Sequence, residues 1–584
     1  MASLEEKRHT LAHLLAQAVL EHYPNSLLTL GPAVDNGFYY DIDFGAEKLA
    51  DADLSKIEKA MRRNLPKWTA FSHREVSKDE AHALFTGNAY KLELVDEIAA
   101  KGEPITVYEC GGFADLCRGG HAEHPAKEIP AESFALDRVA GAYWRGDEKN
   151  PMLTRIYGLA FETKAELDAY LKQREEAKKR DHKILGPALD LFTFSDLVGA
   201  GLPLWTPKGT IVRNLLDDFV WSLRQARGYE RVEIPHITKK DLYIASGHWE
   251  KYQDDLFKIK TREGHEFAMK PMNCPHHTQI YARKQWSYRD LPQRYANTTA
   301  CYRDEQTGEL SGLSRVRAFS QDDAHVFCRM SQVKEEFLKI WDIVHEFYPV
   351  FGFELKVRLS RHDPAHPEKY LGDKERWEKA ENLLKEIVAE KKVSAIDGLG
   401  EAAFYGPKLD FMAHDSLGRE WQVATIQLDM NMPERFDLYC VNEKGEQERI
   451  VMIHAAIMGS IERFLSILIE HTAGIFPLWL SPVQVKVLPV SEKHNEYGAG
   501  VLKELKAAGI RAEIDDANES LGKKIRAAKT EKVPYLFVIG DKEAGGKAVT
   551  VETRSGSEGA KPLAEVIEAM KQKIATRENG ETQA

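Results

Sequence analysis

The sequence is poor in cysteine and lacks the patterns that mark secreted and membrane proteins. Its 584 residues include six irregularly spaced cysteines and no CxxC pair, which argues against a zinc ribbon or a thioredoxin-type site. No run of about 18 apolar residues is present, and the charged N-terminus MASLEEKRHT has no apolar stretch of a signal peptide. We therefore expect free thiols, no membrane span and a cytoplasmic location.

The chain also lacks an excess of basic residues. It has 80 Lys and Arg against 91 Asp and Glu, a net charge of −11, whereas proteins that coat DNA are usually basic. A local basic groove on an acidic enzyme still allows a nucleic-acid partner. No internal repeat is visible, and the length predicts three or four domains at roughly 100–200 residues each.

The periodicity of apolar residues divides the chain into an N-terminal, a central and a C-terminal block. In the first we expect an opening amphipathic helix, a strand over 37–44, a helix over 77–85, and a loop over the glycine-rich segment 109–121. A long charged helix over 163–185 is expected to connect this block to the next.

The central block, from about Leu189 to Leu478, has strands in runs with large insertions between them. Examples are the segments 230–235, 294–303 and 315–323. This arrangement favours an α+β fold with a mainly antiparallel sheet over a doubly wound sheet. From about Ser481 strands and helices alternate regularly, which predicts a small three-layer α/β domain.

The segment CYRDEQTGELSGLSRVRAFSQDD predicts a strand, a flexible loop and a returning strand. This geometry places Arg303, Glu305 and Phe319 on one face of a hairpin. An arginine can grip phosphate, a glutamate can accept from an exocyclic amine, and a phenylalanine can stack on a base, so the set suits a nucleotide. A charged surface hairpin is the alternative, and the spacing does not decide between the two.

The segment IMGSIERFLSILIEH predicts a buried helix with an apolar stripe that includes Ile461 and Phe464. Arg463 lies beside that stripe, and a buried arginine needs an anionic partner. A polyphosphate would serve, but taken alone the helix favours a structural salt bridge, for example with Glu462.

Together with RGYERVEIPHI, these segments resemble the three signature motifs of class II aminoacyl-tRNA synthetases. FAMKPMNCPHH, SGLSRVRAFSQDDAHVF, YGPKLDF and IVMIHAAIMGSIERF are similar to the threonyl-tRNA synthetase family in particular, and the resemblance covers nearly the whole chain. It implies a homodimer that activates L-threonine with ATP to threonyl-adenylate and transfers threonine to the 3′ end of tRNA(Thr).

The resemblance also implies a multidomain α+β architecture. The expected parts are an α+β editing domain over 1–160, a connecting helix over 161–188, a class II catalytic domain with an antiparallel sheet over 189–480, a small α/β anticodon-binding domain over 481–577, and a disordered tail over 578–584. The small ubiquitin-like domain with which many members of the family begin is not expected here.

The family's site residues carry over to matching positions of this chain. The resemblance assigns Arg303, Arg463 and Lys408 to catalysis, Glu305, Arg315 and Phe319 to ATP binding, and Gln321, Asp323, Tyr405 and Gln427 to threonine binding. Magnesium is expected with ATP. Chemically this is positioning and charge neutralisation at an in-line attack on phosphorus, which needs no protein nucleophile.

In the family, the positions of Cys274, His325 and His454 bind zinc. Their separations of 51 and 129 residues are no zinc signature, so this metal site is implied by the resemblance alone. A thiolate and two imidazoles leave coordination positions open for the amino group and hydroxyl of threonine. Valine lacks that hydroxyl, and a purely steric pocket rejects such an isostere by only roughly 10²-fold. Asp323, two residues before His325, shares its strand face and is expected to accept the hydroxyl proton.

One position departs from the family pattern. The family usually reads Cys-Pro-Gly-His, whereas this chain has Cys274-Pro275-His276-His277. If the replaced glycine uses positive φ, the loop is altered, and His276 could act as an additional metal ligand.

A site that reads the hydroxyl of threonine also admits serine, so error correction is expected. His9 and His13 share a helix face, and Cys117 and His121 flank a Gly-Gly pair. Such histidine pairs alone are mostly structural, but the combined set resembles the family's editing domain, which hydrolyses seryl-tRNA. The resemblance adds Lys91 and Asp115 to this site. We expect His9 and His13 to position or activate water, without a required metal.

The C-terminal block carries a basic helix with Lys523, Lys524, Arg526 and Lys529, which suits unpaired anticodon bases or is simply a solvated face. Two further functions compete with threonine–tRNA ligation. One is a sister synthetase such as a prolyl or seryl enzyme, which the Cys/His/His set and Asp323 argue against. The other is a non-catalytic RNA-binding paralogue, against which the presence of both Arg303 and Arg463 argues.

Overall fold

The computed structural model describes residues 2–578, which divide into two compact units at Glu175 and Glu176. Of the tail expected at 578–584, all but Glu578 lies outside the described residues. Among the helices of the described part, none is both long and apolar enough to cross a membrane.

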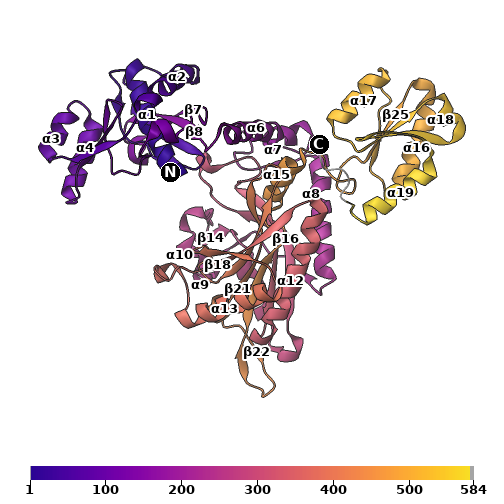
Figure 1. Ribbon diagram of the computed structural model, residues 1–584. Coiled ribbons are helices and arrows are strands. Elements are labelled where there is room, and N and C mark those ends of the chain that lie inside the picture. The colour runs from indigo at the N-terminus through magenta and orange to yellow at the C-terminus, as the bar shows by residue number, and fades with distance from the viewer. Residues whose placement is uncertain (1, 579–584) are drawn as a thin grey trace. The chain divides into compact units, whose positions relative to one another are not determined.

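The first unit is built around an antiparallel sheet in the order β1-β3-β8-β7, with β2 paired to β3. The strands are β1 (Leu27–Leu28), β2 (Ala33–Val34), β3 (Gly37–Asp43), β7 (Phe134–Tyr143) and β8 (Met152–Ala160). Helices α1 (Leu4–His22) and α2 (Leu54–Asn64) pack on it through one apolar core (Figure 1). The expected opening helix and the strand at 37–44 are confirmed.

A smaller sheet in the same unit contradicts part of the loop expected over 109–121. It contains β4 (Ser72–Glu75), β5 (Thr106–Cys110) and β6 (Phe113–Leu116), beside helices α3 (Lys78–Leu84), α4 (Ala89–Ala100) and α5 (Pro125–Glu128). Gly111 and Gly112 have φ of 57° and 75° and connect the paired residues Cys110 and Phe113. A two-residue hairpin turn of type I′ needs positive φ at both central positions, so this Gly-Gly pair forms the turn between β5 and β6.

The connecting helix expected over 163–185 is two helices, α6 (Lys164–Arg180) and α7 (His182–Ala188). Asp181 separates them with extended ψ of 120° and caps α7 by accepting a hydrogen bond from the backbone N–H of Lys183. A capping aspartate accepts a hydrogen bond that a backbone carbonyl would accept in a continuous helix. This explains why the helix breaks at Asp181 although the charged pattern of the sequence continues.

The central sheet of the second unit has eight strands in the order β11-β16-β17-β24-β21-β20-β18-β19. They are β11 (Glu230–Arg231), β16 (Gln293–Tyr302), β17 (Ala318–Cys328), β18 (Glu354–Arg361), β19 (Ala395–Leu399), β20 (Lys408–His414), β21 (Glu420–Asp429) and β24 (Val451–Ala456). Every neighbouring pair is antiparallel except the two outermost pairs. The expected mainly antiparallel sheet is confirmed, although the strand expected over 230–235 covers only two residues.

Helices cover this sheet, and their apolar residues form a large core together with those of the central strands. Helices α8 (Pro207–Gln225) and α12 (Val333–Phe347) pack against each other, and α12 also contacts β21 and β24 (Figure 1). Two further long helices are α13 (Lys374–Glu390) and α15 (Ile461–Thr472). Shorter elements complete this part: β9 (Phe192–Thr193), β10 (Leu204–Trp205), β12 (Ile237–Lys239), α9 (Lys240–Ser246), α10 (His248–Lys251), β13 (Lys258–Lys260), β14 (Glu266–Met269), α11 (Cys274–Ala282), β15 (Trp286–Ser287), α14 (Asn431–Arg435), β22 (Tyr439–Val441) and β23 (Gln447–Arg449).

The last segment forms a five-stranded sheet in the order β26-β25-β27-β28-β29, in which the first three strands are parallel. Its elements are β25 (Val485–Pro489), α16 (Asn495–Ala507), β26 (Ala512–Ile514), α17 (Leu521–Thr530), β27 (Tyr535–Ile539), α18 (Asp541–Gly546), β28 (Ala548–Thr553), β29 (Gly556–Pro562) and α19 (Leu563–Ala575). Helices α16 and α19 share one apolar cluster and α17 belongs to another, so the expected three layers are confirmed.

Candidate functional sites

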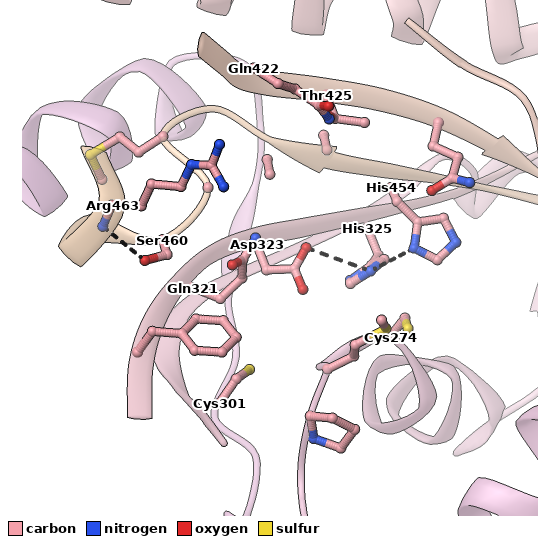
Figure 2. A pocket seen from close by; sticks show the side chains of 18 of the residues that line it. Cys274, Cys301, Gln321, Asp323, His325, Gln422, Thr425, His454, Ser460 and Arg463 are labelled. Carbon is pink, nitrogen blue, oxygen red and sulfur yellow. Dashed lines mark hydrogen bonds and ion pairs between the residues drawn. The ribbon is translucent and has the colours of Figure 1, made fainter. Parts of the chain in front are cut away.

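The second unit contains a pocket of about 370 Å³ along one face of β17. Phe319, Gln321, Asp323 and His325 all line it, because alternate residues of a strand point to the same side. Figure 2 shows Gln321, Asp323 and His325 in sequence along this strand, with Arg463 toward one end and His454 toward the other. The alternation of one strand thus provides a continuous wall.

The pocket brings together most of the residues expected from the sequence. These are Cys274, Arg303, Phe319, Gln321, Asp323, His325, Tyr405, Gln427, His454 and Arg463. Glu305, Arg315 and Lys408 are not among the residues that line it. The pocket is also lined by residues that were not expected from the sequence: Met272, Cys301, Gln422, Thr425 and Ser460. An amide, a hydroxyl or a small apolar group forms no motif by itself, so only its place in the fold identifies it.

Cys274, His325 and His454 form a buried cluster at one end of the pocket. Their ligand atoms all lie within 4.8 Å of one another. His325 and His454 are directly opposite each other on β17 and β24, and Cys274 begins α11. Residues 129 positions apart in the sequence therefore become neighbours through strand pairing.

Two buried neighbours fix the orientation of the histidine rings. The carboxylate of Asp429 lies 3.0 Å from Nε2 of His454, and His277 lies 2.8 Å from Nδ1 of His325. The remaining ring nitrogens, Nδ1 of His454 and Nε2 of His325, face each other at 3.1 Å. Metal-binding histidines are usually held in this way by a second hydrogen bond. Neither Asp429 nor His277 was expected from the sequence to belong to this site.

The protonation states of the cluster fit a divalent cation. Burial and the neighbouring imidazoles hold the pKa of His325 well below its usual range, so its ring is a neutral ligand. Burial, with Asp323 and Asp429 nearby, raises the pKa of the Cys274 thiol well above its usual range. The protein alone therefore does not stabilise a thiolate there, whereas a metal ion does so directly. One thiolate with two imidazoles is the donor set of an open zinc site.

His276 causes neither of the effects considered from the sequence. It lies in the first turn of α11 and is absent from the described residues with positive φ, so it fits the ordinary helical backbone. It is not part of the cluster with Cys274, and neither of its buried ring nitrogens has a hydrogen-bond partner among the described residues. Burial lowers the pKa of His276 to about 4.

Asp323 lies beside this cluster, with Oδ1 3.8 Å from Nε2 of His325. Its Oδ2 accepts a hydrogen bond of 3.1 Å from the side-chain amide of Asn273. Burial raises the pKa of Asp323 to about 6, against the opposing effects of His454 and Asn273. The carboxylate is thus available as a partly buried acceptor beside Cys274, His325 and His454.

The other end of the pocket carries the arginines and the aromatic ring expected for a nucleotide. The Arg303 guanidinium lies 5.2 Å from the centre of the Phe319 ring. Arg315 is paired with Glu305 at 2.7 Å and with Glu309 at 3.1 Å, which holds both arms of the hairpin loop together.

The expectation that Arg463 is buried and favours a salt bridge with Glu462 is wrong. Helix α15 is buried, but the Arg463 side chain itself is exposed at the pocket (Figure 2). Glu462 turns the other way, into the core, where it accepts a hydrogen bond of 2.8 Å from the backbone N–H of Ser320. Adjacent helical positions point about 100° apart, so one faces the pocket while the other is buried. Arg463 is therefore available to an anion.

Lys408 lies at the edge of this region rather than in the pocket wall. Its ammonium is 2.8 Å from the carboxylate of Asp410. Tyr405 and Gln427 do line the pocket, and Gln427 donates a hydrogen bond of 2.9 Å to the carbonyl of Gly406.

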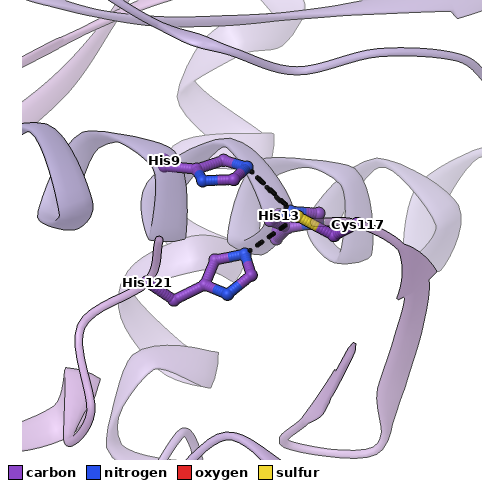
Figure 3. A group of neighbouring side chains, drawn as sticks. All are labelled: His9, His13, Cys117 and His121. Atoms are coloured by element: carbon purple, nitrogen blue, oxygen red, sulfur yellow. Dashed lines mark hydrogen bonds between the residues drawn. The ribbon is translucent and has the colours of Figure 1, made fainter. Parts of the chain in front are cut away.

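The first unit holds a second site, at which His9, His13, Cys117 and His121 converge (Figure 3). The Cys117 sulfur lies 3.5 Å from Nε2 of His9 and 3.4 Å from Nε2 of His121, and the rings of His9 and His13 approach to 3.3 Å. His9 donates from Nδ1 to the carbonyl of Gly120, which directs its Nε2 toward the cluster. This confirms that the helix pair and the loop pair lie together.

Asp115 links this cluster to the remaining residues that the resemblance assigned to it. Its carboxylate contacts Lys91 at 2.5 Å, His13 at 3.1 Å and the hydroxyl of Tyr40 at 2.6 Å. The adjoining pocket, of about 540 Å³, is lined by Lys91 and Asp115 together with His9, His13 and Cys117. Tyr40 was not expected from the sequence.

The charges of this site support one another. Burial opposes the ionised forms, but Asp115 and Cys117 outweigh it and raise the pKa of His13 to about 9. The surrounding histidines similarly lower the pKa of the half-buried Cys117 thiol to about 3. With Lys91 and His13 adjacent, the pKa of Asp115 is held below its usual range. His13 is thus a charged donor at neutral pH, not a free base.

The basic helix α17 differs from the expectation in one residue. Lys523, Arg526 and Lys529 are exposed, but Lys524 is buried and donates hydrogen bonds to the carbonyls of Pro489 and Asp515. Lys524 and the buried Ala528 lie one turn apart on the face toward the sheet, so Lys524 is not part of a solvent-exposed basic surface.

Three family models match parts of the chain. Residues 257–472 match the tRNA synthetase class II core domain (G, H, P, S and T), residues 484–573 the anticodon binding domain, and residues 105–157 the threonyl and alanyl tRNA synthetase second additional domain.

Curated relatives and a solved structure are similar over most of their length. A threonine–tRNA ligase of Porphyromonas gingivalis is 50% identical over 549 residues, covering 93% of this chain and 83% of the relative. One of Deinococcus radiodurans is 48% identical over 562 residues, covering 95% and 86%. The crystal structure of the RNA binding domain of threonyl-tRNA synthetase from Cryptosporidium parvum is 38% identical, covers 67% of this chain and 98% of its own, and gives a TM-score of 0.64.

Proposed function

The chain belongs to the threonyl-tRNA synthetase family, and on that premise we propose that it joins L-threonine to tRNA(Thr) in the pocket along β17. In the first step a carboxylate oxygen of threonine attacks the α-phosphorus of ATP, the bond to the β-phosphate oxygen breaks, and threonyl-adenylate and pyrophosphate form. In the second step a terminal ribose hydroxyl of the tRNA attacks the carbonyl carbon and releases AMP.

The residues at the nucleotide end bind and neutralise rather than react covalently. We assign the adenine ring to Phe319 and Glu305, and the phosphates to Arg303, Arg315 and Arg463, with magnesium bound to ATP. Arg463 supports this assignment because it opens on the pocket and has no carboxylate partner among the described ion pairs. A guanidinium placed in a pocket stabilises the charge that develops on the transferred phosphoryl oxygens.

At the other end we propose that Cys274, His325 and His454 hold zinc. When bound, zinc supplies coordination positions for the amino group and hydroxyl of threonine. Asp323 accepts the hydroxyl proton, Asn273 holds that carboxylate in place, and Gln321, Tyr405 and Gln427 surround the substrate. Valine offers no hydroxyl, so these buried polar groups would be left unpaired, which rejects it far more strongly than shape alone.

The observation that carries this proposal is the single row of side chains on β17, from Phe319 at the nucleotide end to His325 at the metal end. ATP–pyrophosphate exchange with threonine, serine, valine and proline tests it, together with metal analysis. We expect exchange with threonine and one zinc per chain, both lost in Cys274→Ala. Cys328→Ala is the matched control, because Cys328 is also a buried cysteine but lies at the end of β17, outside the pocket. Exchange with proline but not threonine would contradict the proposal.

For the first unit we propose hydrolysis of seryl-tRNA(Thr) at the cluster of His9, His13 and Cys117. Because Nδ1 of His9 is bound to the carbonyl of Gly120, its Nε2, which faces His13 and Cys117, is the ring nitrogen that can take a proton from water. The charged His13 and the ammonium group of Lys91 stabilise negative charge that develops on the ester. The water oxygen attacks the carbonyl carbon, and serine and free tRNA leave.

Deacylation of seryl-tRNA(Thr) tests this second activity. We expect His9→Ala to abolish it while threonine activation stays unchanged, and His124→Ala to leave both intact, since His124 is an exposed histidine outside the pocket. We also expect activity to survive removal of metal from the editing site. Loss on chelation that zinc restores would show that the metal is required.

We further propose that the chain acts as a homodimer through the segment around β11, and that the C-terminal α/β domain binds the tRNA anticodon. The exposed Lys523, Arg526 and Lys529 provide the positive charge for such a contact. Analytical ultracentrifugation decides the oligomeric state, and a monomer at micromolar concentration would contradict it.

A further inference from the structure

The carboxylate of Asp410 lies beneath the pocket wall and accepts an unusual number of hydrogen bonds. It is on β20, is fully buried, and contacts five side-chain donors. The donors are Arg358 at 3.1 Å, Ser360 at 2.7 Å, Lys408 at 2.8 Å, Gln422 at 2.9 Å and Thr425 at 2.8 Å. A buried carboxylate needs partners, but one or two cations would be enough for that.

The two oxygens of Asp410 divide these donors between two sides. Oδ2 receives the three from β18 and β20, and Oδ1 receives both donors from β21, Gln422 and Thr425. Gln422 and Thr425 are pocket-lining residues, whereas Asp410 is not. The carboxylate therefore connects the interior of the sheet to groups that a ligand can touch.

An irregularity of β21 makes this convergence possible. Residues three apart on a regular strand point to opposite faces. Here Phe411 pairs with Ala424 and Met412 with Gln422, so Val423 is an extra residue on β21. The bulge brings Gln422 to the same face as Thr425, and bulges of this kind frequently re-aim side chains next to active sites.

The position of these two donors along β21 indicates which substrate they face. Gln427, on the same strand, is paired with the metal-cluster residue His454. Gln422 lies five residues earlier, roughly 15 Å away along the strand. In Figure 2 it lies toward the end of the pocket that holds Arg463 and Ser460, above the strand with Asp323. Gln422 and Thr425 thus face the nucleotide side, where an amide and a hydroxyl suit the sugar hydroxyls or phosphate oxygens of ATP.

We propose that Asp410 is a positioning residue for ATP, through the orientation that it gives to Gln422 and Thr425. This inference rests on the proposed function of the pocket. Asp410 does not touch the substrate: its Oδ1 holds the two donors, while Oδ2 keeps Lys408 at the edge of the site. Without the charge at Oδ1, Thr425 loses its acceptor, and Gln422 keeps only its hydrogen bonds with Arg358 and Thr425. Both side chains are then held less firmly.

The test is the Asp410→Asn substitution. An asparagine keeps the volume of the side chain but has only one oxygen. We expect this oxygen to face the cations Arg358 and Lys408, so that the NH2 group faces Gln422 and Thr425. The pocket side then loses its acceptor. We expect the KM for ATP in threonine-dependent ATP–pyrophosphate exchange to rise about tenfold, the loss of about one charge-assisted hydrogen bond. The KM for threonine should change by less than about twofold.

Asp415→Asn is the matched control. Asp415 is also a buried aspartate, in the turn between β20 and β21, with donors from Leu417, Arg419 and Trp421, but it does not line the pocket. We expect it to lower thermal stability without raising the KM for ATP. The inference is overturned if Asp410→Asn behaves as Asp415→Asn does, or if it raises the KM for threonine instead.

A milder variant keeps the inference testable if Asp410→Asn does not fold. Ser360→Ala, at a position outside the pocket, removes one of the three donors that hold Oδ2 of Asp410. The carboxylate can then turn, which weakens its hold on Gln422 and Thr425 through Oδ1, and we expect about a threefold rise in the KM for ATP. An unchanged KM overturns the inference. Exchange by the wild-type protein separates this outcome from failure of the proposed function, because that failure would show as the absence of threonine-dependent exchange in the wild type.

Discussion

His325 and His454 are direct cross-strand partners on β17 and β24, and the ring nitrogens that they turn toward each other are 3.1 Å apart. Each ring has its other nitrogen occupied, by His277 and by Asp429 respectively. Two imidazoles oriented in this way direct Nε2 of His325 and Nδ1 of His454 toward one point, and the Cys274 sulfur lies near the same point. Metal binding at this cluster therefore depends on His277 and Asp429, which orient the rings, as much as on the three ligands themselves.

Asp429→Asn is expected to weaken zinc binding by about 10- to 100-fold, although Asp429 is not a ligand. Without the negative charge of Asp429, the His454 ring is a less basic metal ligand, and its orientation is no longer fixed. Competition with a chelator, followed by metal analysis, measures the effect independently of activity. Asp437→Asn is the control, because Asp437 is an exposed aspartate that pairs with Arg449. Equal affinities of the two variants would contradict the assignment.

Asp323→Ala is expected to reduce discrimination between threonine and valine. With the hydroxyl acceptor present, rejection of valine should reach about 10⁴-fold or more, and without it should approach the roughly 10²-fold that shape alone provides. Exchange kinetics with both amino acids give the ratio. If the ratio stays unchanged while threonine activation falls, Asp323 supports the fold of the pocket and does not read the hydroxyl.

The protonated form of His13 is expected to stabilise helix α1 in a pH-dependent way. The pKa of His13 is raised from 6.5 to about 9, so its contribution is fully present below pH 6.5 and is lost as the pH rises through about 9. Amide hydrogen exchange of α1 in the full chain, compared between wild type and His13→Gln at each pH, measures this. The protection of wild type over the variant should be largest near pH 6 and should shrink above pH 9.

His22→Gln serves as the control for this comparison, because His22 is an exposed residue at the end of the same helix. A constant difference between wild type and His13→Gln from pH 6 to pH 10 would show that packing alone explains the effect of that substitution.

Gly312→Ala is expected to damage the hairpin loop between Arg303 and Phe319. Gly312 has φ of 51°, and an added Cβ would lie 2.3 Å from Nε2 of His182. That ring is fixed, since it contacts Glu470 at 2.6 Å and accepts from the backbone N–H of Leu313. The substitution should destabilise the protein by about 1–3 kcal/mol and raise the KM for ATP.

Gly308→Ala is a matched control for Gly312→Ala in the same loop, because no atom lies within 4 Å of its added Cβ and its φ is not positive. Thermal denaturation and exchange kinetics on both variants separate the clash with His182 from a general stiffening of the loop. Similar effects of the two substitutions would rule out the clash.

Local pattern was enough to identify many elements of this protein. The amphipathic opening helix, the hairpin strands β16 and β17, and the regular alternation of the C-terminal segment follow from periodicities of 3.6 and 2 residues, which depend on near neighbours. The row from Phe319 to His325 follows from the same alternation. The motifs around these elements also indicated the family to which the chain belongs.

Only the tertiary structure decided which polar side chains face one another. The convergence of Cys274 with His454, the contacts of Asp429 and Asp410, and the exposure of Arg463 all depend on strand pairing between distant segments. Burial of Lys524 and the break at Asp181 likewise reflect partners that no local pattern names. The physical reason is that the free energy of a buried charge is set by the donors and acceptors around it, which the fold supplies from far along the chain.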